Sequence, residues 1–510
     1  MQAWVERDGY TPDDIVLTSL TRAAAAVLAG RVPVPRENIA TLHALAYRAL
    51  GSPPIAEIGD LAAIWNREHA SLPSWQIGAG TVDVDEDAGF APPDAELGEQ
   101  MRLYSLARNR LAPYGHPLWA LTTAFAREWE AFKTETGSLD FTGMLEQAAT
   151  FIDALPQPVL IVDEAQDLVP LQWVLARQWG ARAERFLVAG DAGQQLYGFA
   201  GARPDDLLAP LDAAETVYHL AQSYRLPPAI AGHAERLLRR HSGPLTDGRE
   251  YRPDTRRGEG LVRPLAATWR RPEAVVEAVQ RRLADTPYEA GEGPTVMVLA
   301  ACAYMLAPTV RALREAGVPF HNPMRRANGA WNPLGSVARH VEGKRSTARM
   351  VAAYAAGEPY GEWIDLLRAD VFLLRSAKKL LAGDASADFD AVVRPEHRDA
   401  LAAHDLGWLL GHLLAQYRGP AEYAASVVRR SGPEAITQPP RVVIGTGHSV
   451  KGGESRMVIC YPDMSASGMN EAHASQEGAD AAVRLAYVCW TRASEELVLC
   501  DAADPRGALW

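Results

Sequence analysis

Two neighbouring carboxylates follow a short apolar run in the segment PVLIVDEAQDL (158–168). Asp163 and Glu164 come directly after four apolar residues, a pattern typical of a buried parallel strand. Carboxylates at the carboxyl end of such a strand lie at the edge where α/β sheets bind ligands. Magnesium prefers one or two carboxylates together with phosphate oxygens, which suits Asp163, and Glu164 could then orient or deprotonate an attacking water. An Asp-Glu pair alone more often caps a helix, but the longer DEAQD string favours catalysis.

A second segment, VAGDAGQQLYGFAGA (188–202), runs from another apolar stretch into a glycine-rich turn. The Gln194 amide could sense a terminal phosphate or an attacking water by hydrogen bonding. Tyr197 and Phe199 offer flat faces on which nucleic-acid bases could stack. Taken alone, this segment is better interpreted as a turn followed by core aromatics. Its combination with DEAQD favours the functional interpretation.

Charge and composition limit the classes of function. The net charge of −12, from 63 acidic and 51 basic residues, argues against coating of duplex DNA by bulk electrostatics. A local basic groove is still compatible with it, although arginine pairs such as Arg256 and Arg257 fit a solvated face by themselves. The sequence has no apolar run of about 18 residues and no signal-peptide pattern, so we expect a cytoplasmic protein that does not contact a membrane. The four cysteines lack paired zinc spacing, and we assign them no chemistry.

The catalytic candidates need strands to position them, and apolar runs of strand length recur along the chain. Helical periodicity separates most of these runs, which predicts parallel α/β sheets. Segments of helical and loop character interrupt the pattern twice, so the sequence predicts two α/β units, each with a helical insertion. The expected strands are 15–18, 159–162, 185–189 and 216–220 in the first unit, and 296–300, 319–321, 442–444, 457–460 and 497–500 in the second.

Seven short strings in chain order resemble the motifs of the UvrD/Rep family of superfamily 1 DNA helicases, over nearly the whole sequence. They match motifs Ia, Ib, II, III, IV, V and VI of that family in turn. The strings are TSLTRAAA (18–25), TLHALAYR (41–48), DEAQD (163–167), GDAGQQLYGFAGA (190–202), LAQSYR (220–225), TGHSVKGGE (446–454) and RLAYVCWTRA (484–493).

The resemblance implies roles in ATP hydrolysis, with ATP and Mg²⁺ as cofactors. Asp163 would hold the magnesium, Glu164 would be the catalytic base, and Gln194 would contact the terminal phosphate. Arg225 and Arg492, from the first and second motor domains, resemble the paired arginines that stabilise charge on the transferred phosphoryl group.

The resemblance also implies contacts to the nucleoside and to single-stranded DNA. Tyr224 would stack on the adenine, and Glu454 would hold the ribose. The residues expected along the DNA path are Thr41, His43, Tyr197, Phe199 and His448. Each histidine also fits a satisfied core residue. Leu20 and Ala200 depart from the family pattern, since many relatives carry a base-stacking aromatic and an arginine at these positions.

The phosphate-binding string G-x-x-x-x-G-K-[ST] does not occur in the 510 residues. It is needed because backbone N–H groups cradle the phosphates while lysine and hydroxyl groups serve phosphate and magnesium. In the family it precedes motif Ia by a helix, yet only fourteen residues stand before Ile15. Three explanations remain open: an incomplete sequence or misplaced start, a DNA-binding or partner-binding protein without hydrolysis, or a motor whose loop another chain supplies. We expect weak or no hydrolysis by this chain.

The implied architecture is two RecA-like parallel-sheet domains of the P-loop NTPase type. The nucleotide cleft is expected between the motifs of the two domains, and single-stranded DNA would cross both, with movement from 3′ to 5′. Duplex junctions are further expected partners, and a bacterial or phage source is expected. The expected boundaries are 1–50 and 138–235 for the first domain, 51–137 for its helical insertion, 236–324 and 441–510 for the second domain, and 325–440 for a compact helical insertion.

Overall fold

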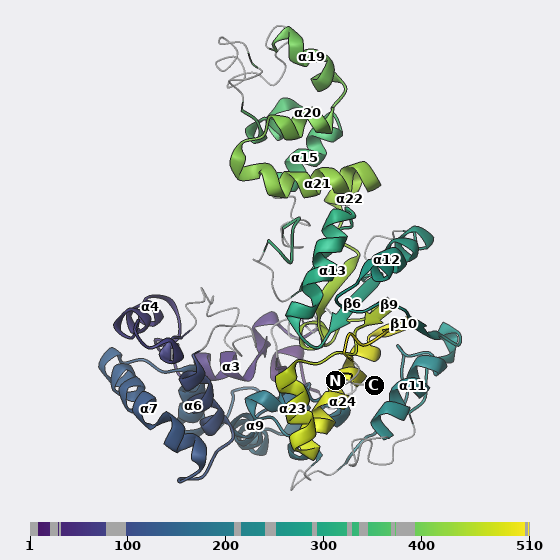
Figure 1. Ribbon diagram of the computed structural model, residues 1–510. Helices are drawn as coiled ribbons and strands as arrows, with labels where there is room; N and C mark the ends of the chain where they lie inside the picture. The colour runs from purple at the N-terminus through teal and green to yellow at the C-terminus, as the bar shows by residue number, and fades with distance from the viewer. Residues whose placement is uncertain are drawn as a thin grey trace. The chain divides into compact units, whose positions relative to one another are not determined.

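The computed structural model describes most of the chain, in two compact units. Unit 1 comprises the described residues of Met1–Tyr218, and unit 2 those of His219–Gly243 and Gly248–Trp510. Figure 1 shows the elements of both units with their labels. The described residues are 9–20, 29, 32–77, 98–208, 216–239, 251–287, 293–323, 329–335, 345–368, 373, 393–504 and 508.

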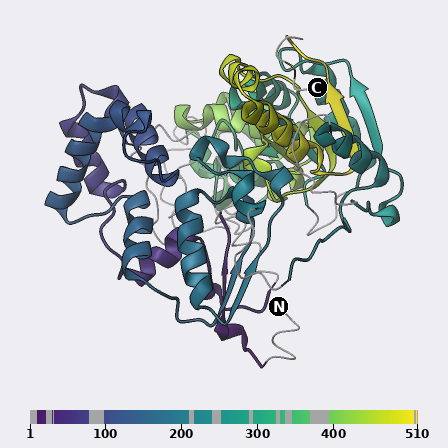
Figure 2. The same ribbon diagram turned by 90° about the horizontal axis from the view of Figure 1, so that it is seen from below.

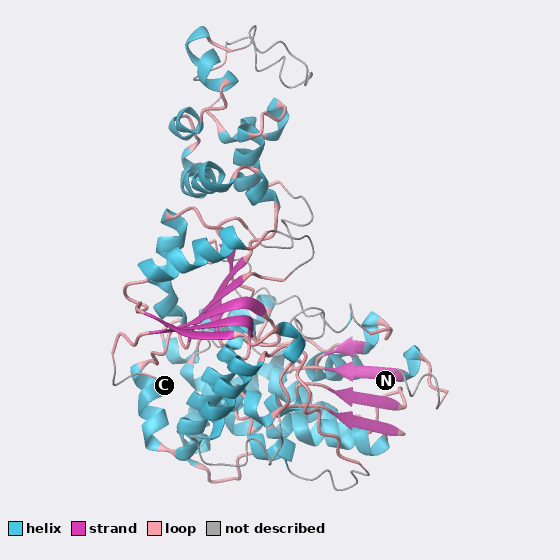
Figure 3. Ribbon diagram, turned by 90° about the vertical axis from the view of Figure 1, so that its right-hand side faces the viewer, coloured by secondary structure: helices cyan, strands magenta, loops and turns pink. Residues whose placement is uncertain are grey.

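Unit 1 contains a four-stranded parallel sheet with the order β2-β1-β3-β4. Figure 3 shows these strands side by side and pointing the same way. The two inner strands are buried at every residue, since their apolar side chains pack on both faces of the sheet. The sheet consists of β1 (Ile15–Thr18), β2 (Ile39–Ala40), β3 (Val159–Val162) and β4 (Arg185–Val188).

Helices of unit 1 cover this sheet and form the segment between β2 and β3. Thr41 begins α3, because its hydroxyl accepts a hydrogen bond from the N–H group of Ala44 (3.2 Å). Figures 1 and 2 show α4, α6 and α7 together as one group of helices. The α-helices are α3 (Leu42–Ala49), α4 (Gly59–Glu68), α6 (Glu99–Asn109), α7 (Pro117–Thr136), α8 (Phe141–Phe151), α9 (Pro170–Arg182) and α10 (Pro204–Leu208).

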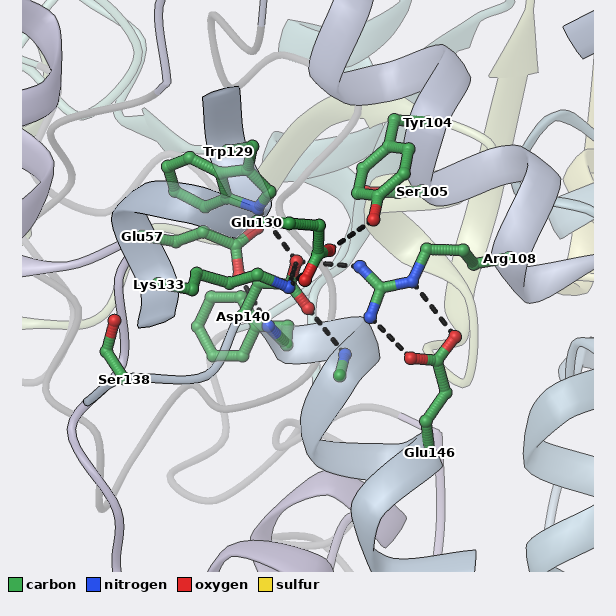
Figure 4. A network of polar contacts seen from close by, with 12 residues as sticks. Glu57, Tyr104, Ser105, Arg108, Trp129, Glu130, Lys133, Ser138, Asp140 and Glu146 are labelled. Carbon is green, nitrogen blue, oxygen red and sulfur yellow. Dashed lines mark hydrogen bonds and ion pairs between the residues drawn. The ribbon is translucent and has the colours of Figure 1, made fainter. Parts of the chain in front are cut away.

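A buried ion network joins α6 and α7 to the start of α8 (Figure 4). Asp140 is 1% exposed, and one of its oxygens accepts hydrogen bonds from Arg108 (2.7 Å), Trp129 (2.8 Å) and Lys133 (2.8 Å). Its other oxygen accepts from the N–H group of Gly143 (2.5 Å) and so caps α8. Burial alone would raise the pKa of Asp140, but the charges of Arg108 and Lys133 lower that pKa below its usual range. The network therefore fixes three helices through one carboxylate.

Glu57 belongs to the same network and should make the stability of unit 1 depend on pH. Removal from water and the nearby Asp140 charge raise the pKa of Glu57 to about 8, against opposing effects of the Phe141 N–H group, Arg108 and Lys133. A carboxyl group with a raised pKa is protonated in the folded state but ionised in the unfolded chain, so stability falls as the pH rises between about 4.5 and about 8. Hydrogen exchange of α7 and α8 in urea, from pH 5 to 9, measures this dependence.

The matched variant for this prediction is Glu57→Gln, which cannot ionise. The difference in unfolding free energy between the wild type and this variant should change with pH by up to roughly 1.4 kcal/mol per unit, the value for one proton. A difference that stays constant over this pH range would contradict the raised pKa.

Unit 2 contains a six-stranded parallel sheet with the order β5-β10-β9-β6-β8-β7. The central strand β6 is buried at every residue, because helices cover both faces of the sheet. The strands are β5 (Leu261–Leu265), β6 (Val296–Ala300), β7 (Phe320–His321), β8 (Val442–Thr446), β9 (Ser455–Cys460) and β10 (Ala493–Cys500).

The helices of unit 2 include a group between β7 and β8, whose buried residues, Tyr354 and Trp363 among them, belong to the same apolar core as the strands of the sheet. Figure 1 shows α15, α19, α20, α21 and α22 in this group. The α-helices are α11 (Pro228–Arg239), α12 (Glu273–Asp285), α13 (Ala303–Glu315), α15 (Thr347–Ala355), α19 (Pro395–Ala402), α20 (Leu406–Gly411), α21 (Arg418–Ser431), α22 (Glu434–Thr437), α23 (Ala466–Ala474) and α24 (Gln476–Trp490).

The prediction of two parallel α/β sheets is confirmed, and one predicted strand is wrong. Residues 216–220 form no strand, and three of their apolar side chains are strongly exposed: Val217, Tyr218 and Leu220. An apolar run becomes a strand only where other elements cover it, and the elements in the described part of the chain leave these side chains exposed. The helix that the alanine-rich stretch 21–29 predicts lies largely outside the described residues. Among the described helices, none combines the length and the apolar character that a membrane crossing requires.

Candidate functional site

Asp163 and Glu164 lie at the carboxyl end of β3, where the sequence predicts them. The N–H group of Asp163 donates to the carbonyl oxygen of Thr18 at the end of β1 (2.8 Å), and the N–H group of Ala165 donates to Ala189 after β4 (2.9 Å). Between these two bonds, Glu164 adopts the left-handed backbone conformation, with φ of 54°. The turn therefore holds both carboxylates at the edge shared by β1, β3 and β4.

Two buried hydroxyl groups border this edge. Thr18 is 1% exposed and Ser19 is 2% exposed, and in the described part of the chain their oxygens Oγ1 and Oγ have no hydrogen-bond partner. A buried hydroxyl without a partner costs free energy, which a bound polar ligand can recover. Among the described residues there is no group of three or more His, Cys, Asp or Glu that could hold a metal alone. Two carboxylates fit Mg²⁺, which takes its remaining ligands from water and phosphate.

Gln194 lies in the turn after β4, and DEAQD contacts this turn directly. The Gln194 amide donates to Asp191 Oδ2 (2.8 Å), while Asp191 Oδ1 accepts from the N–H group of Gly193 (2.9 Å). Gln166 bridges the two motifs, because its amide donates to Glu164 (2.5 Å) and accepts from the N–H group of Asp191 (3.0 Å). The structure therefore brings Glu164 and Gln194 into one hydrogen-bonded group.

The two aromatic residues of the same segment differ in exposure. Tyr197 is 3% exposed, and Phe199 is 44% exposed, with 5.7 Å between their ring centroids. Burial and the nearby charges of Asp167 and Glu164 raise the pKa of Tyr197 above its usual range. Asp167 also accepts a hydrogen bond from the N–H group of Leu196 (3.1 Å). The ring of Phe199 is thus accessible to a base, whereas Tyr197 packs in the interior.

Thr41 and His43, predicted on the DNA path, are both buried, with exposures of 3% and 7%. The hydroxyl of Thr41 caps α3, and the ring of His43 packs edge-on against Phe141, with 6.3 Å between centroids. Burial lowers the pKa of His43 to about 4. His43 is therefore neutral near pH 7 and carries no positive charge toward a phosphate.

The lowered pKa of His43 predicts a loss of stability in mild acid. The unfolded chain binds a proton at this residue below about pH 6.5, whereas the folded chain stays neutral until about pH 4, so stability falls as the pH drops through this window. Urea unfolding of the wild type and of His43→Gln measures the effect. The wild type should have a higher free energy of unfolding than this variant at pH 7, and this difference should shrink toward pH 4. A difference that does not depend on pH would contradict the prediction.

In unit 2, the predicted residues of motifs IV and V lie together. Arg225 pairs with Glu454, with 3.0 Å between Nε and Oε2, across 229 positions of the sequence. Tyr224 is 67% exposed, and the Arg256 guanidinium lies 5.4 Å from its ring centroid. Arg257 donates to the carbonyl oxygen of Tyr224 (3.0 Å). Tyr224 therefore keeps an accessible ring, with Arg256 against that ring and Arg257 bonded to its backbone.

Arg492 lies between the end of α24 at Trp490 and the start of β10 at Ala493, and it is 1% exposed. Its guanidinium donates to the carbonyl oxygens of Val488 (2.9 Å) and Gly453 (3.2 Å). The second bond places Arg492 beside the residue that precedes Glu454. His448 is partly exposed in the turn after β8. Motifs V and VI therefore meet at the start of β9 and β10.

Two pairs of residues at these sites were not among those predicted from the sequence. Gln166 and Asp191 link motifs II and III, and the signal was present, because both stand inside the recognised strings. Arg256 and Arg257 support Tyr224, although by themselves they fit a solvated pair. Tyr224 and Arg225, expected in the first motor domain, belong to unit 2. Gln166, Asp191, Arg256 and Arg257 differ from ordinary surface and turn residues only in their contacts with residues distant in the sequence.

The chain is similar to several known proteins. The AAA_19 family model, described as an AAA domain, matches residues 1–200. The putative ATP-dependent DNA helicase YjcD of Bacillus subtilis (strain 168) is 24% identical over 46% of this chain and 34% of the relative. The ATP-dependent DNA helicase UvrD2 of Mycobacterium tuberculosis (strain ATCC 25618 / H37Rv) is 30% identical over 39% of this chain and 31% of the relative. DNA helicase II of Escherichia coli (strain K12) is 25% identical over 29% of this chain and 23% of the relative.

The two parallel sheets and the carboxylates at a strand end define an α/β protein of the P-loop NTPase-like class. Within that class, the chain is similar to the ATP-dependent DNA helicases YjcD and UvrD2 and to DNA helicase II. The chain covers 34% and 31% of the length of YjcD and UvrD2.

Proposed function

We propose that this chain is the body of a motor that couples ATP hydrolysis to movement along single-stranded DNA, from 3′ to 5′. The observation that carries the proposal is the grouping of Asp163, Glu164 and Gln194 at the carboxyl ends of β3 and β4. A carboxylate pair and a hydrogen-bonded glutamine at such an edge suit phosphoryl transfer to water. The relatives, which are named ATP-dependent DNA helicases, support the same activity.

In this proposal ATP with Mg²⁺ supplies the phosphoryl group, and the chain positions the reacting groups. Asp163 holds the magnesium, Glu164 orients and deprotonates the water, and Gln194 contacts the terminal phosphate. In unit 2, Tyr224 stacks on the adenine. Glu454, already paired with Arg225, holds the ribose.

The proposed positive charges for the transferred phosphoryl group are Arg225 and Arg492. Arg225 has a partly exposed guanidinium, with 33% of its side chain accessible. The Arg492 guanidinium donates to two carbonyl oxygens and to the hydroxyl of Thr491 (3.1 Å), so it must exchange at least one of these partners to reach a phosphate. For DNA, Phe199 offers an exposed aromatic face, and the partly exposed His448 is a second proposed contact. Duplex junctions are further proposed partners.

A second candidate function is single-stranded DNA binding without hydrolysis. The observation that favours it is that the string G-x-x-x-x-G-K-[ST] does not occur in the 510 residues. Positioning of the phosphates supplies most of the catalysis in this chemistry, so weak or absent turnover is expected. The motor proposed first would instead need this loop from a further segment or a second chain.

The deciding experiment measures ATP turnover by the 510-residue chain, with and without single-stranded DNA, together with Glu164→Gln. We expect DNA binding that weakens steeply with salt, and turnover at or near background. Turnover that depends on DNA and disappears in Glu164→Gln would establish the motor for this chain and refute the expected inactivity. A chain that neither hydrolyses ATP nor binds single-stranded DNA would contradict both candidates.

A further inference from the structure

Gln166, in the middle of DEAQD, has no role in the chemistry proposed above, yet its side chain lies between the residues that have one. Its amide nitrogen donates to Glu164 Oε2 (2.5 Å), and its amide oxygen accepts from the N–H group of Asp191 (3.0 Å). Gln166 is 1% exposed, so water competes little for either bond. An amide suits this position because it donates and accepts at the same time.

The backbone on both sides is shaped to bring this amide into place. A Cβ atom at Gly190 would lie 2.6 Å from Gln166 Oε1 and 3.2 Å from the backbone nitrogen of Gln166, so only glycine permits the close approach. On the other side, Glu164 adopts a left-handed conformation that costs free energy for a residue with a side chain. These two features indicate that the bridge is specified by the local structure.

The bonds continue from Asp191 into the turn that carries Gln194. Asp191 accepts from the Gln194 amide (2.8 Å) and from the N–H group of Gly193 (2.9 Å). A displacement of Glu164 therefore reaches Gln194 through Gln166 and Asp191. A change at Gln194 reaches Glu164 along the same bonds.

We propose that Gln166 is a positioning residue that couples the Glu164 carboxylate to the turn at 190–194. The proposed base and the proposed phosphate contact then move as one unit. The biological meaning of this coupling rests on the proposed function, but the coupling itself is a property of the chain without nucleotide or DNA. It can therefore be tested separately.

The test is hydrogen exchange of the amides in 190–196, measured by mass spectrometry on the 510-residue chain without nucleotide or DNA. Glu164→Ala removes one acceptor of the bridge, and Gln166→Leu removes the bridge. Each variant should exchange about five- to tenfold faster in this segment, the effect of losing roughly one hydrogen bond. The double variant should exchange no faster than Gln166→Leu, because the two residues act in series.

Two further variants keep the test specific. Glu164→Gln retains an acceptor oxygen and should exchange at the wild-type rate. Gln172→Leu is the matched control, because Gln172 is a buried glutamine (2% exposed) whose oxygen accepts from the N–H group of Val169 (3.0 Å). It should leave exchange in 190–196 unchanged.

Two results would overturn the proposal. In one, Glu164→Ala leaves exchange in 190–196 unchanged, as expected if Gln166 only supports the turn. In the other, the effects of the two single variants add in the double variant. DNA affinity and ATP turnover of the same preparations report on the proposed function separately. If the coupling is found but the chain does not bind DNA, the proposed motor function is contradicted and the role of Gln166 still stands.

Discussion

Asp140→Asn is expected to destabilise unit 1 by about 3–5 kcal/mol, the range for breaking a buried ion pair. The carboxylate of Asp140 accepts from the Arg108 guanidinium, the Lys133 ammonium and the Trp129 indole. Asparagine keeps the shape but not the charge, so two cations with side chains 7% exposed lose their central counter-ion. It also places an amide where the Gly143 N–H group or these donors need an acceptor. Hydrogen exchange of α7 and α8 in a urea series measures the loss.

Glu128→Gln is the matched control for this variant. It also removes one carboxylate from an ion pair with an arginine, but the Arg127 and Glu128 side chains are 78% and 46% exposed. Exposed pairs contribute about 0.2–1 kcal/mol, so this control should stay near the wild type. If Asp140→Asn cost no more than Glu128→Gln, the network would not hold unit 1 together. The lowered pKa of Asp140 also means that its contribution is present above the unfolded pKa and is lost as the pH falls.

Phe199→Ala is expected to weaken binding of single-stranded DNA by about 5- to 150-fold, which corresponds to the roughly 1–3 kcal/mol of one stacked base. Phe199 is 44% exposed, whereas the neighbouring Tyr197 is 3% exposed, so the stacking face belongs to Phe199. The measurement is the affinity for a fluorescent oligothymidine over a series of salt concentrations. The slope of the logarithm of the affinity against the logarithm of the salt concentration should match that of the wild type. Alanine removes a stacking face and no phosphate contact.

Phe151→Ala provides the control for this prediction. Phe151 is a more exposed phenylalanine of unit 1 (68%), at the end of α8, with no proposed DNA contact. It should bind DNA as the wild type does. If Phe199→Ala bound equally well, the proposed DNA path through motif III would be wrong. A change of slope with salt would instead mean that the variant had disturbed phosphate contacts.

The strands that carry the site could be predicted because their signal is local. Ile15–Thr18 and Val159–Val162 are strands β1 and β3 as the apolar runs indicate, since four consecutive buried side chains need both faces of a sheet. The residues 216–220 carry a similar run, yet they form no strand and expose Leu220 at 89%. Burial on two faces depends on what packs against a segment, and a short window of sequence does not contain that information.

For the candidate site too, some features follow from the local sequence and others only from the folded structure. The sequence by itself determined the residue types and their order: Asp163 and Glu164 after a strand, Gln194 in a glycine-rich turn, and the resemblance of the strings to one family. The tertiary structure decided which of these groups meet and which face solvent. Only the folded chain buries Tyr197 and His43, exposes Phe199, joins Glu164 to Asp191 through Gln166, and brings Arg225 to Glu454 across 229 positions. Exposure, pKa and pairing arise from neighbours distant in the chain, and these neighbours are brought together only by folding.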